Sequence, residues 1–391
     1  MSDTDLPKQV LNCLRDVLPH SKGFIALHEP TFAGNELRYT KECIDTGWVS
    51  SAGKYVDRFE LELARYTGAK HAVAVVNGTA ALQVSLQLAG VKHLDEVLMP
   101  SLTFIATANA VKYLGATPHF VDINHETLGV CPGKLRDYLT ESTVQRNNLC
   151  VNKKTNKVIR VLLPMHTFGH PVELDDLMNI CKEFNLTMVE DAAESLGSLY
   201  KQGHTGTVGL ISAISFNGNK IVTCGGGGAI ITNDKGLAQK AKHLTTTAKR
   251  PHKWAFFHDE TGYNFRMPNL NAALGVAQLE QLDGFIKNKR SLALKYQRVF
   301  ESVKGVSFFR EPLDCKSNYW LNVLLLNNDS KHLRDNILKL TNDNGFMTRP
   351  VWEPMHTLPM YSECPRMDLS RTDNIANRLI NIPSSPFLNE L

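Results

Sequence analysis

The sequence has no long apolar run, no block of like charges and no closely spaced pair of cysteines. No segment reaches the ~18 apolar residues of a membrane-spanning helix. The first apolar stretch, residues 10–19, contains Arg15 and Asp16 and therefore does not match the core of a signal peptide. The eight cysteines include no C-x-x-C motif, so we assign no metal site and expect reduced thiols. Together these absences predict a cytoplasmic protein that does not associate with membranes.

The charges are nearly balanced, and the chain is long. Lys and Arg number 43 against 39 Asp and Glu, a net charge of +4, and no run of like charge could follow a phosphate backbone. We therefore expect no nucleic acid partner. With 43% hydrophobic and 21% charged residues, the composition is that of a globular protein. Because cores stop growing near ~250–300 residues, a chain of 391 residues predicts two domains.

From about residue 56, short apolar runs alternate with helical patterns. These runs are HAVAVV (71–76), EVLMP (96–100), VIRVLLP (158–164), LTMVE (186–190) and LISAISF (210–216). Strands that alternate with helices predict an α/β fold whose mostly parallel sheet is covered on both faces. An interruption at residues 147–161 predicts a hairpin inserted before the next core strand.

Two further regions flank this pattern. Apolar residues on one helical face predict a short amphipathic helix over residues 6–18 that packs against the main fold. After Asn269 the pattern changes to a long helical stretch followed by short strands, which is typical of a smaller α+β domain. We thus expect an N-terminal helical extension (1–22), a large domain (23–268) and a small C-terminal domain (269–391).

The stretch SFNGNKIVTCGGGG, residues 215–228, places Lys220 just before four consecutive glycines. A phosphate-binding P-loop places its lysine after the glycines, and both it and the dinucleotide-binding motif lead into a helix. Here the glycines follow the lysine and lead into AIIT, an apparent strand, so both nucleotide motifs are excluded. A lysine held for covalent chemistry and a solvated lysine before a tight turn both remain open at this point.

Chemically useful side chains follow the other predicted strands as well. In open α/β sheets, ligands bind outside the carboxyl ends of the strands. Each residue alone has a structural explanation, such as a helix cap, a core aromatic or a satisfied histidine. The residues that follow the five strands are, in order, Gly78 with Thr79, Phe104, His166, Asp191 with Glu194, and Ser215 with Lys220.

Taken together, these residues describe one ligand. A helix N-terminus at Thr79 favours an anion such as a phosphate, and Phe104 could cover a planar ring. Asp191 offers a carboxylate, and Lys220 an amine nucleophile. Pyridoxal 5′-phosphate (PLP) needs a lysine for its Schiff base and an acid beside its pyridine nitrogen, so the set predicts a PLP site.

Several segments resemble the sugar-nucleotide aminotransferases of the DegT/DnrJ type, which have the type I PLP-dependent aminotransferase fold. They are PSLTFIATANAV, VEDAAESLGS, SFNGNK, GYNFRM and LNAALGVAQLEQL, and the resemblance extends from about Ile25 to Ile382. The leading helix and FIALHEPTFAGNELRYTKECIDTGWVSSAGKYVDRFE are most similar to enzymes that aminate a UDP-linked 4-keto-6-deoxy-N-acetylhexosamine for legionaminic-type sugars.

The resemblance implies roles for the matching residues. Lys220 would form the Schiff base and then move the proton between the cofactor carbon and the sugar carbon. Asp191 would pair with the pyridine nitrogen, and Phe104 would stack on the ring. The remaining cofactor contacts would be Glu194 near the ring hydroxyl, Gly78, Thr79 and Ser215 at the phosphate, and Asn264 at the phosphate of a neighbouring subunit, which implies a homodimer.

L-Glutamate would give its amino group to the cofactor, and the sugar ketone would then accept it at C4, in the biosynthesis of bacterial surface sugars. Trp48, in the loop 47–53, His166 and His356 are candidate substrate contacts. Packing is the alternative explanation for Trp48 and His356, and a satisfied buried histidine is the alternative for His166.

The glycine run departs from many relatives, with Gly226 in place of a glutamate and Cys224 in place of a threonine, and these departures concern sugar specificity. The alternatives are a PLP-dependent sugar dehydratase, a transaminase of a GDP-linked sugar, an eight-carbon sugar or a keto acid, and a non-enzymatic regulator that binds PLP or a sugar nucleotide. Dehydratase relatives carry histidine in place of the lysine, and a regulator would not need Lys220.

Overall fold

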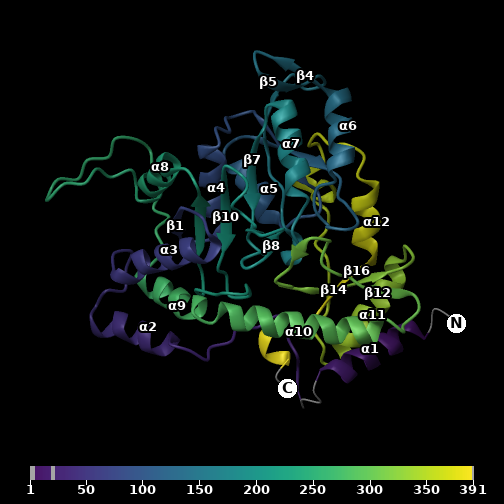
Figure 1. Ribbon diagram of the computed structural model, residues 1–391. Helices are drawn as coiled ribbons and strands as arrows, with labels where there is room; N and C mark the ends of the chain where they lie inside the picture. Colours follow the sequence, from purple (N-terminus) through teal and green to yellow (C-terminus); the bar gives the residue numbers. More distant parts are fainter. Residues whose placement is uncertain (1–4, 19–22, 390–391) are drawn as a thin grey trace.

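The computed structural model describes residues 5–18 and 23–389, and a sheet of nine strands forms its centre (Figure 1). Seven of these strands lie in the order β1, β11, β10, β7, β6, β2, β3, and β5 and β4 extend from β6. Their bounds are β1 His71–Val75, β2 Glu96–Pro100, β3 Thr117–Val121, β4 Thr143–Arg146, β5 Leu149–Asn152, β6 Val158–Leu162, β7 Thr187–Asp191, β10 Ile211–Ser215 and β11 Gly228–Thr232.

The sheet is mostly parallel, as the alternation of strands and helices predicts. The neighbouring pairs β10–β7, β7–β6, β6–β2 and β2–β3 are parallel, whereas β11 runs antiparallel to both β1 and β10. The carboxyl ends of β1, β2, β6, β7 and β10 therefore meet at one edge. Residues that follow these strands come close together even though some of them, such as Gly78 and Lys220, lie far apart in the sequence.

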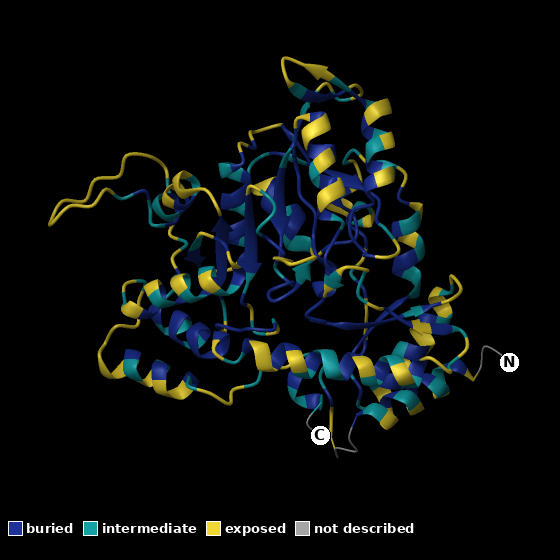
Figure 2. Ribbon diagram, in the orientation of Figure 1, coloured by how far each residue is buried: buried dark blue, intermediate teal, exposed yellow. Residues whose placement is uncertain are grey.

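Helices cover both faces of the sheet, and the buried strands appear dark in Figure 2. Along β1, Val73 and Val75 belong to one hydrophobic cluster, and Ala74, which lies between them, belongs to the other. Such alternation is required when side chains of successive residues point to opposite faces. The helices are α3 Lys54–Thr67, α4 Gly78–Leu88, α5 Ile105–Tyr113, α6 Pro132–Ser142, α7 Leu174–Phe184, α8 Lys235–Thr245 and α9 Asn269–Leu279.

The inserted hairpin is also present. Strands β4 and β5 pair antiparallel, and β5 continues the antiparallel pairing onto β6, the core strand. In Figure 1 this hairpin projects beyond the top of the sheet, away from the edge where the carboxyl ends meet.

A second, antiparallel sheet follows in the C-terminal part, with strand order β12, β14, β16, β15. The single helical stretch predicted after Asn269 is divided into α9 and α10, and α9 packs on α2 and α3. The proposed domain boundary at residue 268 remains a prediction. The bounds are α2 Glu36–Asp45, α10 Leu282–Phe300, α11 Lys331–Asp343, α12 Ser370–Arg378, β12 Val306–Phe308, β14 Asn322–Leu326, β15 Arg349–Pro350 and β16 Leu379–Ile382, and a small third sheet holds β8 Leu199–Tyr200, β9 Gly203–His204 and β13 Cys315–Lys316.

The predicted N-terminal helix is α1, Leu6–Val17, and it packs on α10 and α11. Its buried residues include Val10 and Leu14, both with no exposed surface, so its role in this structure is packing. All eight cysteines are free thiols, as predicted. Within residues 5–18 and 23–389, no helix combines the length and the apolar character that crossing a bilayer requires.

Candidate active site

A cavity of about 410 Å³ opens where the carboxyl ends of the large sheet meet. It brings together seven of the residues predicted from the strand ends, and two tryptophans from the C-terminal part complete its wall. The lining residues are Asn77, Gly78, Thr79, Leu82, Phe104, Ala106, Met165, Asp191, Ala193, Glu194, Ser215, Asn217, Asn219, Lys220, Trp320 and Trp352.

Lys220 lies on the turn between β10 and β11, and its side chain is only 12% exposed. Its Nζ lies 3.2 Å from Oε1 of Glu194 and 3.8 Å from the centroid of the Trp320 ring. A carboxylate and an aromatic face both stabilise an ammonium group, so the amine is held in one place while it is charged. The alternative of a solvated lysine is therefore excluded.

Glu194 is the buried partner of this amine. Its Oε1 faces Lys220, and its Oε2 accepts a hydrogen bond of 2.8 Å from the backbone N–H of Phe168. Phe168 has a φ of 57°, an unusual value for a residue with a large side chain. Burial raises the pKa of Glu194 to about 7, although the charge of Lys220 lowers it. This carboxyl can therefore exchange a proton near neutral pH.

Asp191 ends β7 and presents a second buried carboxylate to the same cavity. Its Oδ2 accepts a hydrogen bond of 2.8 Å from the hydroxyl of Thr107, and its Oδ1 accepts one of 3.2 Å from the N–H of Ala193. Burial raises the pKa of Asp191 despite these hydrogen bonds. A cation in the cavity would offset the cost of this buried charge.

At another part of the wall, two glycines let backbone segments approach closely. A Cβ on Gly78 would lie 2.9 Å from Cβ of Ser215, and one on Gly228 would lie 2.4 Å from the carbonyl carbon of Asn77. Asn77 caps α4 by accepting the N–H of Ala80 at 2.8 Å. The N-terminus of α4 and the Ser215 hydroxyl thus border one space that suits an anion.

Aromatic side chains supply the rest of the wall. The Phe104 ring, 47% exposed, lies 6.1 Å from the Trp352 ring, and Phe168 lies behind Trp352 at 5.1 Å. The indole N–H of Trp320 donates to the carbonyl of Asn219 at 2.8 Å, which fixes the ring beneath Lys220. Neither tryptophan was predicted, because neither follows a strand of the large sheet.

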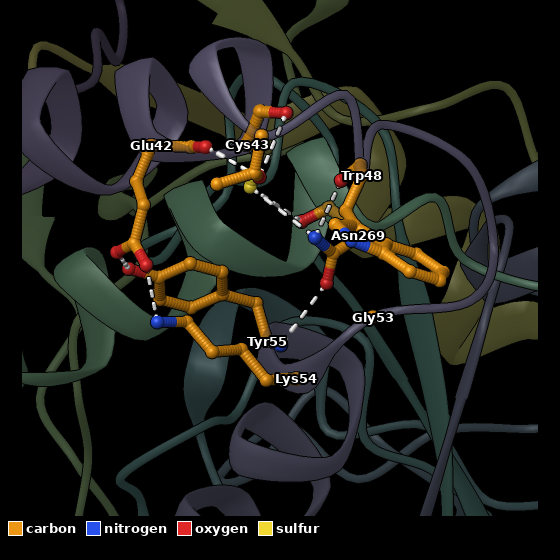
Figure 3. A pocket seen from close by; sticks show the side chains of 8 residues that line it. Glu42, Cys43, Trp48, Gly53, Lys54, Tyr55 and Asn269 are labelled. Atoms are coloured by element: carbon orange, nitrogen blue, oxygen red, sulfur yellow. Dashed lines mark hydrogen bonds and ion pairs between the residues drawn. The ribbon is translucent and has the colours of Figure 1, made fainter.

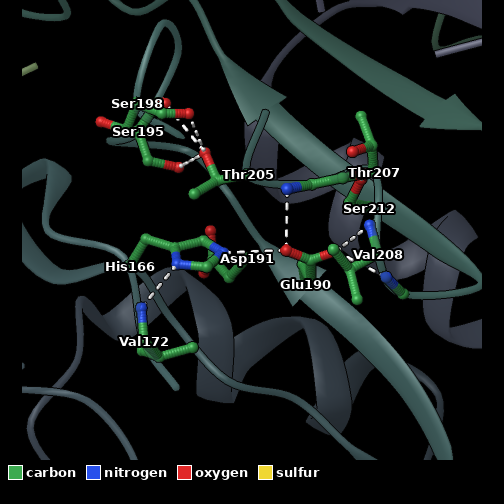
Figure 4. Close-up of polar contacts among 12 residues, drawn as sticks. His166, Val172, Glu190, Asp191, Ser195, Ser198, Thr205, Thr207, Val208 and Ser212 are labelled. Atoms are coloured by element: carbon green, nitrogen blue, oxygen red, sulfur yellow. Dashed lines mark hydrogen bonds and ion pairs between the residues drawn. The ribbon is translucent and has the colours of Figure 1, made fainter. Parts of the chain in front are cut away.

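His166 is not part of the cavity lining, although it follows a sheet strand (Figure 4). Its Nδ1 accepts the N–H of Val172 at 3.3 Å, so the proton resides on Nε2, which lies 2.9 Å from Glu190. Glu190 also accepts the N–H groups of Gly206 and Gly209. These contacts join the loop after β9 to β7, and we propose no substrate role for His166.

Trp48 lines a different cavity, of about 490 Å³ (Figure 3). Asn269 organises this region, because its amide donates to the carbonyl of Trp48 at 2.6 Å and its oxygen accepts the N–H of Tyr55 at 3.0 Å. A Cβ on Gly53 would lie 2.3 Å from the Asn269 side chain, so the loop 47–53 requires a glycine there. The indole of Trp48 itself is 59% exposed.

His356 and Asn264 also lie outside the main cavity lining. His356 borders a neighbouring cavity of about 360 Å³ that shares Trp352 with the main one. Its Nδ1 lies 2.8 Å from the Ser101 hydroxyl, and its Nε2 lies 3.3 Å from Asp373. Asn264 is exposed and accepts hydrogen bonds from Arg266.

Residues 30–390 match the DegT/DnrJ/EryC1/StrS aminotransferase family. The chain belongs to this family. It is 37% identical to a GDP-perosamine synthase of Escherichia coli O157:H7 over 93% of this chain and 94% of that protein. It is 35% identical to the putative pyridoxal phosphate-dependent aminotransferase EpsN of Bacillus subtilis, over 86% and 84% of the two chains. Among solved structures, the aminotransferase TlmJ of Streptoalloteichus hindustanus superposes with a TM-score of 0.83 at 25% identity, covering 93% of this chain and 94% of that one.

The protein is therefore a PLP-dependent sugar aminotransferase with the type I fold, as predicted. The cavity of this aminotransferase fits the cofactor on its own chemistry. The helix N-terminus at Gly78 and the Ser215 hydroxyl suit a phosphate, and the buried Asp191 suits a protonated pyridine nitrogen. The half-buried Phe104 suits a ring face, and Lys220 is the amine in the same cavity.

The pKa of Glu194 gives a prediction about stability in the cofactor-free enzyme. The pKa is raised from about 4.5 to about 7, so the folded state binds this proton more tightly than the unfolded chain does. The carboxyl therefore reduces the free energy of unfolding as pH rises from 4.5 to 7, by on the order of 3 kcal/mol at most. Glu194→Gln cannot ionise, and we expect its melting temperature to fall less than that of the wild type between pH 5 and 8.

Thermal unfolding at a series of pH values measures this difference. Glu183→Gln, at an exposed residue of α7, is the matched control and should follow the wild-type pH dependence. Parallel pH dependence in Glu194→Gln and the wild type would contradict the assignment.

The close approach at Gly78 gives a prediction about cofactor affinity. In Gly78→Ala the new Cβ would meet Ser215, so α4 and the strand end must separate. Overpacking of this kind costs about 1–3 kcal/mol, and we expect PLP to bind roughly tenfold more weakly or worse. Titration of the cofactor-free protein with PLP, followed by absorbance, measures the affinity. Gly133→Ala is the control, because a Cβ there has no neighbour within 4 Å, and equal affinity of Gly78→Ala and Gly133→Ala would refute the phosphate cradle.

Proposed function

We propose that this aminotransferase moves the amino group of L-glutamate to C4 of a UDP-linked 4-keto-6-deoxy-N-acetylhexosamine in the biosynthesis of a bacterial surface sugar. The observation that supports this reaction is that one cavity contains the Lys220 amine and two buried carboxylates, Glu194 and Asp191. The choice of a UDP-linked sugar rests on the resemblance of the segment from Phe24 to Glu60 to enzymes that act on such sugars.

The side chains of the cavity account for the proton transfers that transamination needs. Bound PLP supplies an electron-withdrawing ring that stabilises negative charge on the carbon that gains or loses the amino group. Lys220 would remove and return the proton at that carbon, for which the amine would be neutral for part of the cycle. Glu194, with its pKa near 7 and its oxygen 3.2 Å away, stabilises the charged amine and can take up its proton.

Asp191 and the aromatic wall hold the cofactor in an active state. A buried carboxylate beside the pyridine nitrogen keeps that nitrogen protonated, since the two charges offset each other's burial. Thr107 fixes the orientation of this carboxylate through its hydroxyl. Phe104 and Trp352 line the cavity with their rings 6.1 Å apart and offer aromatic surface to a planar ring.

A GDP-linked 4-keto-6-deoxyhexose is the second candidate substrate. It is favoured by the relative named GDP-perosamine synthase, which is 37% identical and is covered over 94% of its length. Binding residues lie disproportionately on loops, and identity at this level leaves loop side chains free to differ.

We further propose that the enzyme acts in the cytoplasm as a homodimer with shared active sites. Asn264 is exposed and lies outside the cavity lining of its own subunit, which suits a contact to the cofactor phosphate of the partner. The preceding residues 250–262 are nearly all exposed, and in Figure 1 this segment extends well away from the body of the subunit. Exposed Trp254, Phe256 and Phe257 on it provide apolar surface for a second copy.

Substrate choice is tested with the PLP-loaded enzyme and L-glutamate. We expect the wild type to convert the UDP-linked 4-keto-6-deoxy-N-acetyl sugar to an amino sugar that mass spectrometry detects. Lys220→Ala should form none, because it lacks the amine. Conversion of the GDP-linked sugar alone would favour the second candidate, and failure of both sugars to react would refute the proposed function.

Sharing of active sites is tested by mixing two inactive variants, Lys220→Ala and Asn264→Ala. If each site uses Lys220 of one subunit and Asn264 of the other, mixed dimers contain one intact site. Random exchange should then restore roughly a quarter of the wild-type activity. Activity that stays at the level of the separate variants after subunit exchange would show that both residues serve the same subunit's site.

A further inference from the structure

The amine of Lys220 contacts two groups that both favour a positive charge. Its Nζ lies 3.2 Å from Oε1 of Glu194 and 3.8 Å from the centroid of the Trp320 ring. Trp320 and Glu194 are buried, and the Lys220 side chain is nearly so, which leaves little water to compete for the amine. A cation over an aromatic face is stabilised most strongly where it is desolvated. Glu194 and Trp320 therefore form a site for the charged form of this amine.

Contacts that do not involve the amine fix the orientation of the Trp320 ring. The indole N–H donates to the carbonyl of Asn219 at 2.8 Å, and Asn219 directly precedes Lys220 in the chain. The backbone carbonyl of Trp320 accepts a hydrogen bond of 3.1 Å from the buried Lys289. The Phe168 ring lies beside the indole, with the two centroids 6.4 Å apart. The ring face is thus held in place against the segment that carries the lysine.

Asn318 joins the two halves of this ammonium site. Its side-chain amide donates to the carbonyl of Glu194 at 2.9 Å, and its side-chain oxygen accepts the backbone N–H of Trp320 at 2.8 Å. Asn318 has no exposed surface. A Cβ on Gly169 would lie 1.8 Å from the same oxygen, so the glycine leaves room for this link. One buried side chain therefore holds the carboxylate and the aromatic ring relative to each other.

Transamination releases the Lys220 amine from the cofactor for part of each cycle. The nitrogen of L-glutamate forms the C=N bond that Lys220 gives up, so one amine replaces another. Lys220 moves a proton from the glutamate carbon to the cofactor carbon, and water then hydrolyses the bond to the keto acid. The lysine is afterwards an unbound amine until the keto sugar has been aminated. Beside a carboxylate and an aromatic face, such an amine is favoured as an ammonium group.

We propose that Trp320 is a positioning residue whose ring face holds the released Lys220 ammonium beside Glu194. By stabilising the released amine, the ring favours the pyridoxamine form of the cofactor over the form that is bonded to Lys220. This inference rests on the L-glutamate half-reaction of the proposed function and does not depend on the identity of the sugar.

The equilibrium between the two cofactor forms tests this role. Enzyme loaded with PLP is equilibrated with L-glutamate and its keto acid, 2-oxoglutarate, at known ratios, and absorbance gives the amount of each form. In Trp320→Leu the ratio of the pyridoxamine to the pyridoxal form should fall roughly 3- to 30-fold, because the released ammonium loses its aromatic partner. The ratio compares two substrate-free states, so weaker binding of L-glutamate does not by itself change it.

Two further variants separate the aromatic face from the volume of the side chain. Trp320→Phe keeps an aromatic face and should recover part of the lost ratio. Phe168→Leu is the matched control, because it also removes a buried aromatic ring beside the indole, and Phe168 is not part of the cavity lining. This variant should lower the melting temperature and keep the wild-type ratio of cofactor forms.

A double-mutant cycle in the cofactor-free protein is an independent readout. Lys220→Gln keeps most of the side chain and removes its charge. If the ring face stabilises the ammonium, Trp320→Leu should lower the denaturant midpoint more in the wild-type background than in the Lys220→Gln background. A tryptophan that only fills space would shift the midpoint by the same amount in both backgrounds.

Three results would overturn the role of Trp320. They are an unchanged or higher pyridoxamine ratio in Trp320→Leu, no recovery in Trp320→Phe, and equal midpoint shifts in the two backgrounds. Failure of the proposed function looks different. If L-glutamate is not the amino donor, the wild type itself stays in the pyridoxal form, and the double-mutant cycle still decides whether the ring stabilises the charged amine.

Discussion

The active site depends on one electrostatic constraint, which is that a single amine shares a cavity with two buried carboxylates. Burial raises the pKa of both Glu194 and Asp191, so each is stabilised by positive charge brought close to it. Lys220 supplies that charge to Glu194 at 3.2 Å. For Asp191 a bound cation such as a protonated pyridine ring would supply it, and cofactor binding would then stabilise the folded site.

The fold satisfies this constraint by placing the charged groups on adjacent strands. Asp191 ends β7, and Lys220 follows β10, its parallel neighbour, so the two side chains reach one cavity without long loops. Two glycines, Gly78 and Gly228, bring the N-terminus of α4 against the same strand end. The helix N-terminus, the amine and the acid are thus positioned by the buried strands of the sheet.

The C-terminal part of the chain supplies two tryptophans to the cavity lining. The Trp320 ring lies 3.8 Å from the Lys220 amine and so helps to fix its position. The buried Lys289 donates a hydrogen bond to the carbonyl of Trp320 and so helps to hold this residue beside the amine.

The sequence by itself determined the alternating strands and helices, the edge where the strands end and the residues Lys220, Asp191 and Glu194 at that edge. The periodicity of a strand and the succession of strands and helices along the chain are local properties, so residue patterns can predict them. Only the tertiary structure decided that Trp320 lines the cavity. It also decided that His166 lies outside the cavity lining and pairs with Glu190. Those contacts are made between distant segments, and no local pattern records which distant side chain will fill a given space.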